Sequence, residues 1–287
     1  MNLLSLIDQL AGAAASEQPT ARRSALSQLA RTAAATLPLA LGAVAQPAVA
    51  QRAGTQLDAL LLLLQVEWLQ DEFYGRALGT PTLVPAAIQP DLTLIREQQR
   101  QHIARLEAIV AASGGAVPAR PRYDFTGTRG GTQAAAFADV FSNTDTMLAV
   151  AQVLEDLSVR AYLGQVSLLT SNDDLLTLAT RGVTVEGRHS AHLRLLRRQR
   201  GTDVKPWVSA TDNGGPVPSA TAPVYAGEDR VRQLVTATRE VDLSTITPLL
   251  PFSPAITEAE RRAAVTEAID EPLTATAVQA VVALFTA

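Results

Sequence analysis

The sequence predicts an all-α protein: an antiparallel four-helix bundle followed by a mostly irregular C-terminal extension that ends in short helices. Three observations predict this class. Hydrophobic residues make up 47% of the 287-residue chain, and they are mainly Ala and Leu, which favour helix over strand. Four long segments carry apolar side chains at helical spacing. Turn-forming residues separate these segments, and the connectors inside each pair of helices are short.

The four helices are expected over residues 55–78, 91–112, 143–170 and from the turn at 171–174 to residue 201. Asp91 is the expected N-cap of the second helix, because its side chain can accept a hydrogen bond from the first turn. Pro and Gly residues fill the connector before Asp91 and a long loop at about 116–131. Residues 51–200 are therefore interpreted as the bundle domain.

Residues 201–287 are interpreted as a C-terminal extension, because the composition changes there. Residues 206–227 are rich in Pro and Gly, which predicts little regular structure there; they include Pro206, Gly214, Gly215, Pro216, Pro218 and Pro223. Thr257 and Glu260 form a plausible capping box for one short helix, and Thr274 is a plausible cap for another. The extension is expected to pack on the bundle or to mediate assembly.

Residues 1–50 have the features of a secretory signal. An Arg pair at 22–23 precedes an uncharged stretch at 32–45, and Ala48-Val49-Ala50 is a small-residue cleavage site. The Arg pair suggests the twin-arginine route, and the uncharged stretch is too short to span a bilayer. We expect an exported or periplasmic protein. The alternative is a cytoplasmic protein in which this segment is an amphipathic helix followed by a packed Ala-rich stretch.

The composition limits the chemistry that this chain can perform. With no cysteine, it has no disulfide, no thiol nucleophile and no Cys-ligated zinc or iron–sulfur cluster. A net charge of −4 and an aromatic content of 4% do not favour nucleic-acid binding. Any metal site must therefore use carboxylates and the three histidines.

Two of the four helices repeat a Glu and a Tyr seven residues apart. Glu67 precedes Tyr74 at this spacing, and Glu155 precedes Tyr162. Seven residues are about two helical turns, so each Glu shares a face with its Tyr. Both tyrosines are expected in the core, each with a hydrogen-bonded hydroxyl. Trp68 is expected in the core as well.

The partner helices repeat an acid or amide three residues before a histidine. Glu186 precedes His189 and lies 31 residues after Glu155 in the sequence. Gln99 precedes His102 and lies 32 residues after Glu67. An i, i+3 pair projects both side chains from one face. Four helices packed together would bring these groups to the bundle centre, in the arrangement of di-iron and di-manganese carboxylate proteins. His192 is expected on the helix surface.

The segments around these residues resemble the ferritin-like superfamily, in particular bacterial exported ferritin-like domain proteins of the ferritin-2 or desiccation-related type. They are 64–74, 154–156, 160–164 and 185–189, with a looser likeness at 267–273. The resemblance implies metal ligation by Glu67, His102, Glu155, Glu186 and His189, with Glu186 bridging two ions. It implies iron or manganese as the cofactor, and iron oxidation, iron sequestration or oxidative-stress protection as the function.

Gln99 stands where the family pattern has a second bridging Glu. A neutral amide cannot bridge two cations as a carboxylate does. We therefore expect weakened binding beside Glu67 and His102, a better site at the second hairpin, and one ion, two ions or none. Glu97 is a poor substitute, since it lies about 140° around the helix from His102.

A non-catalytic envelope or stress-related bundle with a degenerate metal site is the alternative function. The sequence leaves open whether the protein forms a homo-oligomer.

Overall fold

The computed structural model describes residues 54–209, 212, 214–236, 239–242 and 257–287. The predicted export segment, 1–50, lies outside the described residues. The described elements are, in chain order, α3 (Gln56–Gly79), α4 (Gln89–Ala112), α5 (Thr144–Leu169), α6 (Asp173–Gln199), α7 (Pro218–Tyr225), β1 (Arg232–Thr236), β2 (Arg239–Asp242), α8 (Glu258–Thr266) and α9 (Ala275–Val282).

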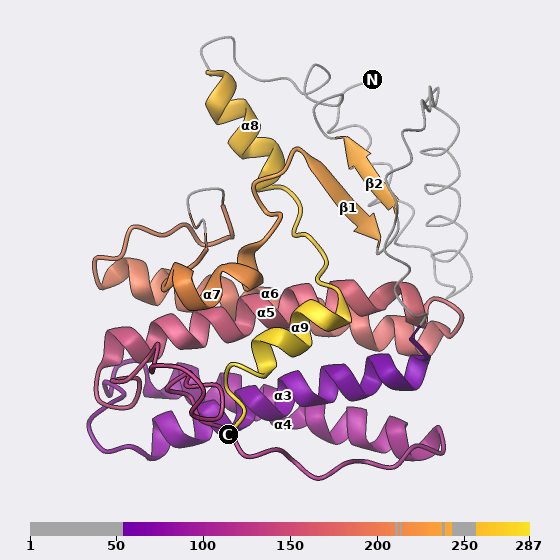
Figure 1. The fold of residues 1–287 in the computed structure, drawn as a ribbon, viewed down its shortest axis with the longest axis horizontal. Helices are drawn as coiled ribbons and strands as arrows, with labels where there is room; N and C mark the ends of the chain where they lie inside the picture. Colours follow the sequence, from indigo (N-terminus) through magenta and orange to yellow (C-terminus); the bar gives the residue numbers. More distant parts are fainter. Residues whose placement is uncertain (1–53, 210–211, 213, 237–238, 243–256) are drawn as a thin grey trace, which may run out of the picture. The chain divides into compact units, whose positions relative to one another are not determined.

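The four long helices α3 to α6 form the predicted bundle (Figure 1). Helix α3 packs on α4, α5 packs on α6, and the two hairpins meet where α3 packs on α5. Thus the all-α class and the four-helix architecture are confirmed. Among the described residues, no helix combines the length and the apolar character needed to cross a membrane.

Side-chain caps set where most of these helices begin. Thr55 caps α3 in a reciprocal capping box with Asp58. Asn143 and Asn172 cap α5 and α6, because each side chain accepts hydrogen bonds from two backbone N–H groups of the first turn. These groups have no partner within the helix, so each cap typically stabilises its helix by about 1 kcal/mol.

The predicted cap of α4 is wrong. The helix begins at Gln89, so Asp91 lies in its first turn, and the N-cap Ile88 makes no side-chain cap hydrogen bond. Pro90 accounts for the earlier start, because its fixed φ suits the first helical turn and its missing N–H would have no helical partner there.

The C-terminal extension is more regular than predicted. The expected short helices are present as α8, capped by Thr257, and α9, capped by Thr274. Helix α7 and the antiparallel hairpin β1–β2 were not expected. The Pro-rich composition concealed α7, yet Pro218 lies in its first turn, where a proline removes no helical hydrogen bond.

Asp156 joins α5 to α6 and α7 through a buried polar network. Its carboxylate lies 2.6 Å from Nη2 of Arg194 and accepts hydrogen bonds from the Ser190 and Tyr225 hydroxyls at 2.5 and 2.6 Å. Asp156 and Arg194 are both fully buried, so each charge depends on the other for compensation. Asp156 therefore serves to attach the extension, although it adjoins Glu155 in the sequence.

Arg160 attaches the extension at a second point. Its guanidinium is buried, pairs with Glu228 at 2.8 Å and donates to the backbone oxygens of Ala226 and Glu271 at 2.8 and 2.6 Å. The backbone oxygen of Arg160 accepts a hydrogen bond from the N–H of Leu273 at 3.0 Å. One arginine thus holds two separate stretches of the extension against α5.

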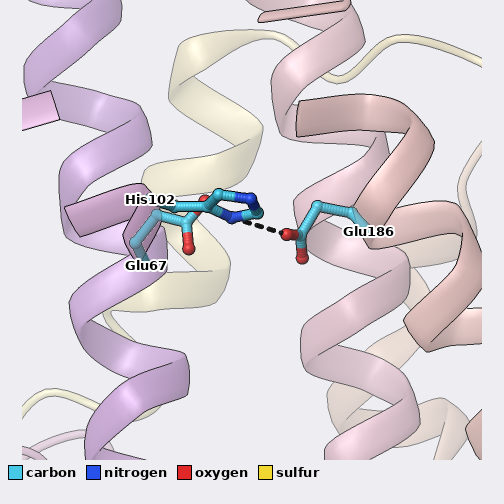
Figure 2. A group of neighbouring side chains, drawn as sticks. All are labelled: Glu67, His102 and Glu186. Carbon is cyan, nitrogen blue, oxygen red and sulfur yellow. Dashed lines mark ion pairs between the residues drawn. The ribbon is translucent and has the colours of Figure 1, made fainter. Parts of the chain in front are cut away.

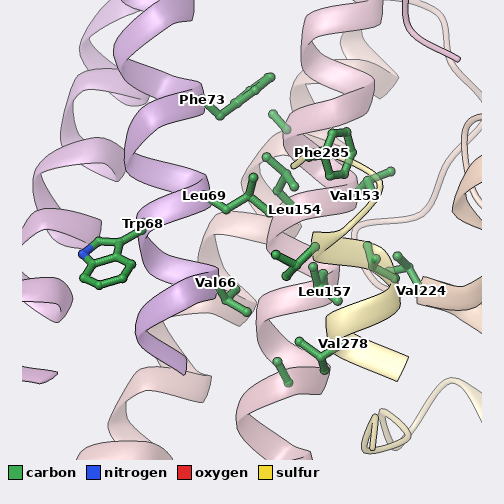
Figure 3. Packing of buried hydrophobic residues seen from close by; sticks show 14 of the residues in the cluster. Val66, Trp68, Leu69, Phe73, Val153, Leu154, Leu157, Val224, Val278 and Phe285 are labelled. Atoms are coloured by element: carbon green, nitrogen blue, oxygen red, sulfur yellow. The ribbon is translucent and has the colours of Figure 1, made fainter. Parts of the chain in front are cut away.

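Apolar side chains complete the attachment (Figure 3). Val278 of α9 and Phe285 beyond it belong to the same buried cluster as Leu154 and Leu157 of α5. Helix α9 contacts both α3 and α5. Each such side chain stabilises the fold by roughly 1.5–3 kcal/mol when fully buried. Packing on the bundle, one of the two roles expected for the extension, is therefore observed.

Gly164 permits the close approach of the extension to α5. A Cβ at this position would lie 1.8 Å from the backbone oxygen of Leu273, whereas a Cβ at Gly187 of α6 would meet nothing within 4 Å.

We expect Gly164→Ala to lower the free energy of unfolding by about 1–3 kcal/mol and to speed proteolysis after Gly201. The matched control Gly187→Ala is expected to raise it by about 0.5–1 kcal/mol. Equal effects in denaturant titrations would contradict this assignment.

Candidate metal centre

All four long helices contribute metal-ligand side chains to the bundle core. Glu67 comes from α3 and Glu155 from α5, while α4 and α6 each contribute a pair with i, i+3 spacing. The six side chains predicted for the site are Glu67, Gln99, His102, Glu155, Glu186 and His189. The carboxylates and Gln99 are fully buried, His189 is buried, and His102 is partly exposed. The structure brings all six together.

The first group contains Glu67, His102 and Glu186 (Figure 2). Nδ1 of His102 lies 3.2 Å from Oε1 of Glu67 and 3.0 Å from Oε1 of Glu186. These are ion-pair distances, but the ring N–H is not aligned for a hydrogen bond to either oxygen. Three ligand atoms from three helices therefore converge on one point.

The second group contains Glu155, Glu186 and His189. Nδ1 of His189 lies 3.3 Å from Oε2 of Glu155 and 3.8 Å from Oε2 of Glu186. The other ring nitrogen, Nε2, lies 2.6 Å from the side-chain oxygen of Gln98. Glu186 is shared, with Oε1 in the first group and Oε2 in the second.

Gln99 is placed differently from the sequence expectation. We expected its amide to weaken the side of Glu67 and His102, but its nitrogen lies 3.2 Å from both oxygens of Glu155 and from Oε2 of Glu186. The nitrogen is also 3.5 Å from Nδ1 of His189. The long side chain crosses towards α5 and α6 because the carboxylates of the second group accept its N–H groups.

Tyrosines and a second amide hold the carboxylates in position. The hydroxyl of Tyr74 on α3 donates to Glu155 on α5 at 2.6 Å, and that of Tyr162 on α5 donates to Glu67 on α3. Both tyrosines are thus core residues with bonded hydroxyls, as predicted. Gln70 donates to Oε2 of Glu186 at 3.2 Å.

Gln70 and Gln98 were not predicted as residues of the centre. The only signal for Gln70 was its position three residues after Glu67 on the same helix face. Glu97 is exposed and pairs with Arg100, so it takes no part in the centre. His192 pairs with Asp91 at 3.0 Å, and both side chains are well exposed, in agreement with the prediction.

Burial and close charges shift the pKa values of the centre. Burial and the nearby Glu186 raise the pKa of Glu67 to about 7 and that of Glu155 to about 8. Burial lowers the pKa of both histidines, but the surrounding carboxylates more than offset this and raise each to about 10. Despite its burial, Glu186 has a lowered pKa because both histidines contact it.

Several buried ligand atoms of the centre have no hydrogen-bond partner. They are Oε2 of Glu67, Nδ1 of His102 and Oε1 of Glu186, all in the first group, together with Oε1 of Gln99. Buried polar atoms are normally paired, because an unsatisfied one costs about 1–3 kcal/mol. A carboxylate and imidazole donor set suits a divalent transition metal. The residues present therefore fit such an ion.

A cavity of about 590 Å³ leads to the first group from the side of α4 and α6. Its lining includes His102 and Tyr162 at the centre and the exposed side chains of Arg105 and Arg181. His189 is not part of this lining. The two groups therefore differ in access as well as in hydrogen bonding.

A four-helix bundle that combines carboxylate and histidine ligands in its core is the architecture of the non-haem metal-carboxylate proteins. A comparison with protein families matches residues 55–199, just over half of the chain, to the ferritin-like domain family. The chain therefore belongs to this family. No curated protein matches the chain.

The shifted pKa values set the pH dependence of the metal-free protein. A group whose pKa is raised by folding adds stability below its ordinary pKa and loses that contribution as pH rises through the folded value. Glu67, Glu155 and the two histidines belong to this class, with folded values from about 7 to about 10. Glu186 has the opposite shift, so its contribution is already complete above its ordinary pKa of 4.5.

We expect the melting temperature of metal-free protein to fall as pH rises from about 6 to about 10, measured by circular dichroism. The fall is expected to be smaller in Glu67→Gln, because that variant lacks one of the carboxyl titrations. A melting temperature that rises across this range would contradict the assigned shifts.

Proposed function

We propose that the protein binds iron or manganese in the bundle core and oxidises Fe(II), with protection against oxidative stress or iron sequestration as the result. The observation that carries this proposal is the convergence of Glu67, His102 and Glu186 on one point with ligand atoms that lack hydrogen-bond partners. Glu155 and His189 belong to the same proposed ligand set, with Gln99 beside them.

The charge of the core supports a cation. Three fully buried carboxylates lie within one centre, and an uncompensated buried charge costs several kcal/mol. In the metal-free protein, protons on the histidines and on the carboxyl groups compensate this charge, and a bound cation would take their place. Oxygen and imidazole donors without thiolate suit iron and manganese. Bound Fe(II) would supply one electron per ion to dioxygen or peroxide.

The protein's own groups would orient the ligands and control access. The crossed hydrogen bonds of Tyr74 and Tyr162 hold Glu155 and Glu67, and such supporting partners commonly change metal affinity by about 10–100-fold. The cavity beside His102 would give a small oxidant a route to the centre.

Metal analysis with a matched pair of variants tests the proposal. After loading with Fe(II) or Mn(II) and desalting, Glu186→Gln is expected to retain at least about tenfold less metal than the parent protein. Glu97→Gln, on the exposed face of α4, is expected to match the parent. The rate of Fe(II) oxidation is likewise expected to fall in Glu186→Gln and to match the parent protein in Glu97→Gln.

Less than about 0.2 metal ions per chain in the parent protein would contradict the proposal, since a site with all its ligands should fill. That outcome would favour the alternative, a non-catalytic envelope or stress-related bundle. In such a protein the buried carboxylates and amides would serve only to hydrogen-bond one another. The dense contacts of Gln99 with the second group are the observation in its favour.

We also propose that the protein is exported, as an exported or desiccation-related member of the family would be. The support is the arrangement of the Arg pair, the uncharged stretch and Ala48-Val49-Ala50 in the sequence. Mass spectrometry of protein from its native host is expected to find Gln51 as the first residue. An intact Met1 on functional protein would overturn export and favour the cytoplasmic alternative.

A further inference from the structure

We infer that the centre holds a single metal ion, in the first group, and that the Gln99 amide occupies the position of a second ion. This inference rests on the proposed metal binding and says where the ion goes. It reverses the expectation from the sequence, which favoured the second group. Four observations support it, and each concerns the second group or the contrast between the two groups.

The amide nitrogen of Gln99 takes the place of a cation. It lies 3.2 Å from three carboxylate oxygens of Glu155 and Glu186 and 3.5 Å from Nδ1 of His189. All three oxygens accept from the amide N–H groups, and the amide oxygen, which cannot donate, could not replace the nitrogen there. An ion in the second group would have to displace this donor from all of its partners.

Glu186 is available to an ion through one oxygen only. Its Oε2 accepts from Gln70 and from Gln99, both at 3.2 Å, while its Oε1 has no hydrogen-bond partner and faces His102. A bridging carboxylate needs both oxygens free for metal. Glu186 is therefore arranged as a single-oxygen ligand of the first group.

His189 is held by protein groups at both ring nitrogens. Nδ1 contacts Glu155 and Nε2 contacts the Gln98 oxygen. In contrast, Nδ1 of His102 lies between two carboxylates, 3.2 Å from Glu67 and 3.0 Å from Glu186, without an aligned hydrogen bond to either (Figure 2). The neighbours of His102 Nδ1 are thus themselves ligands of the first group, so a metal ion between them needs no other protein group to move, and His102 is the better placed of the two.

Access to solvent also differs between the two groups. The cavity beside α4 and α6 is lined by His102, whose side chain is 15% exposed, and His189 is absent from that lining. The cavity thus reaches a ligand of the first group directly, but reaches the second group only at Gln98, whose side-chain oxygen contacts His189. Hydrogen bonding and access, two independent properties, thus select the same group.

Mn(II) titration with variants tests this inference without relying on catalytic activity. We expect one Mn(II) per chain in the parent protein, by calorimetry and metal analysis, with the electron paramagnetic resonance spectrum of an isolated ion. His102→Ala is expected to weaken binding by about tenfold or more, and His189→Ala by less than about threefold.

Two substitutions of Gln99 test the role of the amide directly. Gln99→Glu is expected to raise the stoichiometry towards two and to give the spectrum of a coupled ion pair. Gln99→Ala adds no buried charge and is expected to admit a second, weaker ion, so it keeps the test usable if Gln99→Glu does not fold. Circular dichroism checks the fold of each variant.

The outcomes separate this inference from the proposed function. No Mn(II) in the parent protein would overturn the metal-binding proposal, and the inference with it. Two ions in the parent protein, or loss of the bound ion in His189→Ala, would agree with the metal-binding proposal but overturn the inference. Failure of both folded Gln99 variants to gain an ion would overturn the role of the amide.

Discussion

The burial of three carboxylates and two imidazoles in one bundle core is the constraint on which the rest of the structure depends. Each charge needs a partner because water cannot reach most of the centre. The helices therefore present tyrosine hydroxyls and glutamine amides at the same level, and the tyrosine hydrogen bonds cross between α3 and α5. These bonds join the two hairpins at the place where like charges would otherwise separate them.

A second set of buried charges attaches the extension to the bundle. Asp156 and Arg160 follow Glu155 on α5 but face away from the centre. Asp156 pairs with Arg194 of α6 and accepts from Tyr225 of the extension, while Arg160 pairs with Glu228 and donates to backbone oxygens of the extension. Helix α5 thus has polar groups on two faces with different roles. This explains why so much of α5 is buried, and why its charged residues are not all candidates for the metal centre.

The sequence predicted the architecture better than the detail of the centre. Helical spacing shows which face a residue occupies, so the positions of Glu67, Glu155, Glu186 and both histidines could be inferred. Spacing does not show where a long, flexible side chain ends. The direction of Gln99 depends on carboxylates of two other helices, and neutral amides such as Gln70 belong to no recognisable motif. The hairpin β1–β2 was missed because its residues follow a stretch dominated by Pro and Gly.

The attachment of α9 has a consequence for assembly. Helix α9 contacts α3 and α5, and α7 also contacts α5, so the chain covers part of these two helices with its own C-terminal residues. A second copy that docks directly on the bundle would meet α4 and α6 more readily. The cavity that leads to His102 is lined mainly by residues of these same two helices, with Tyr162 of α5 at its inner end. Self-association through that face would therefore compete with entry to the centre, and protein concentration would become a variable that governs access.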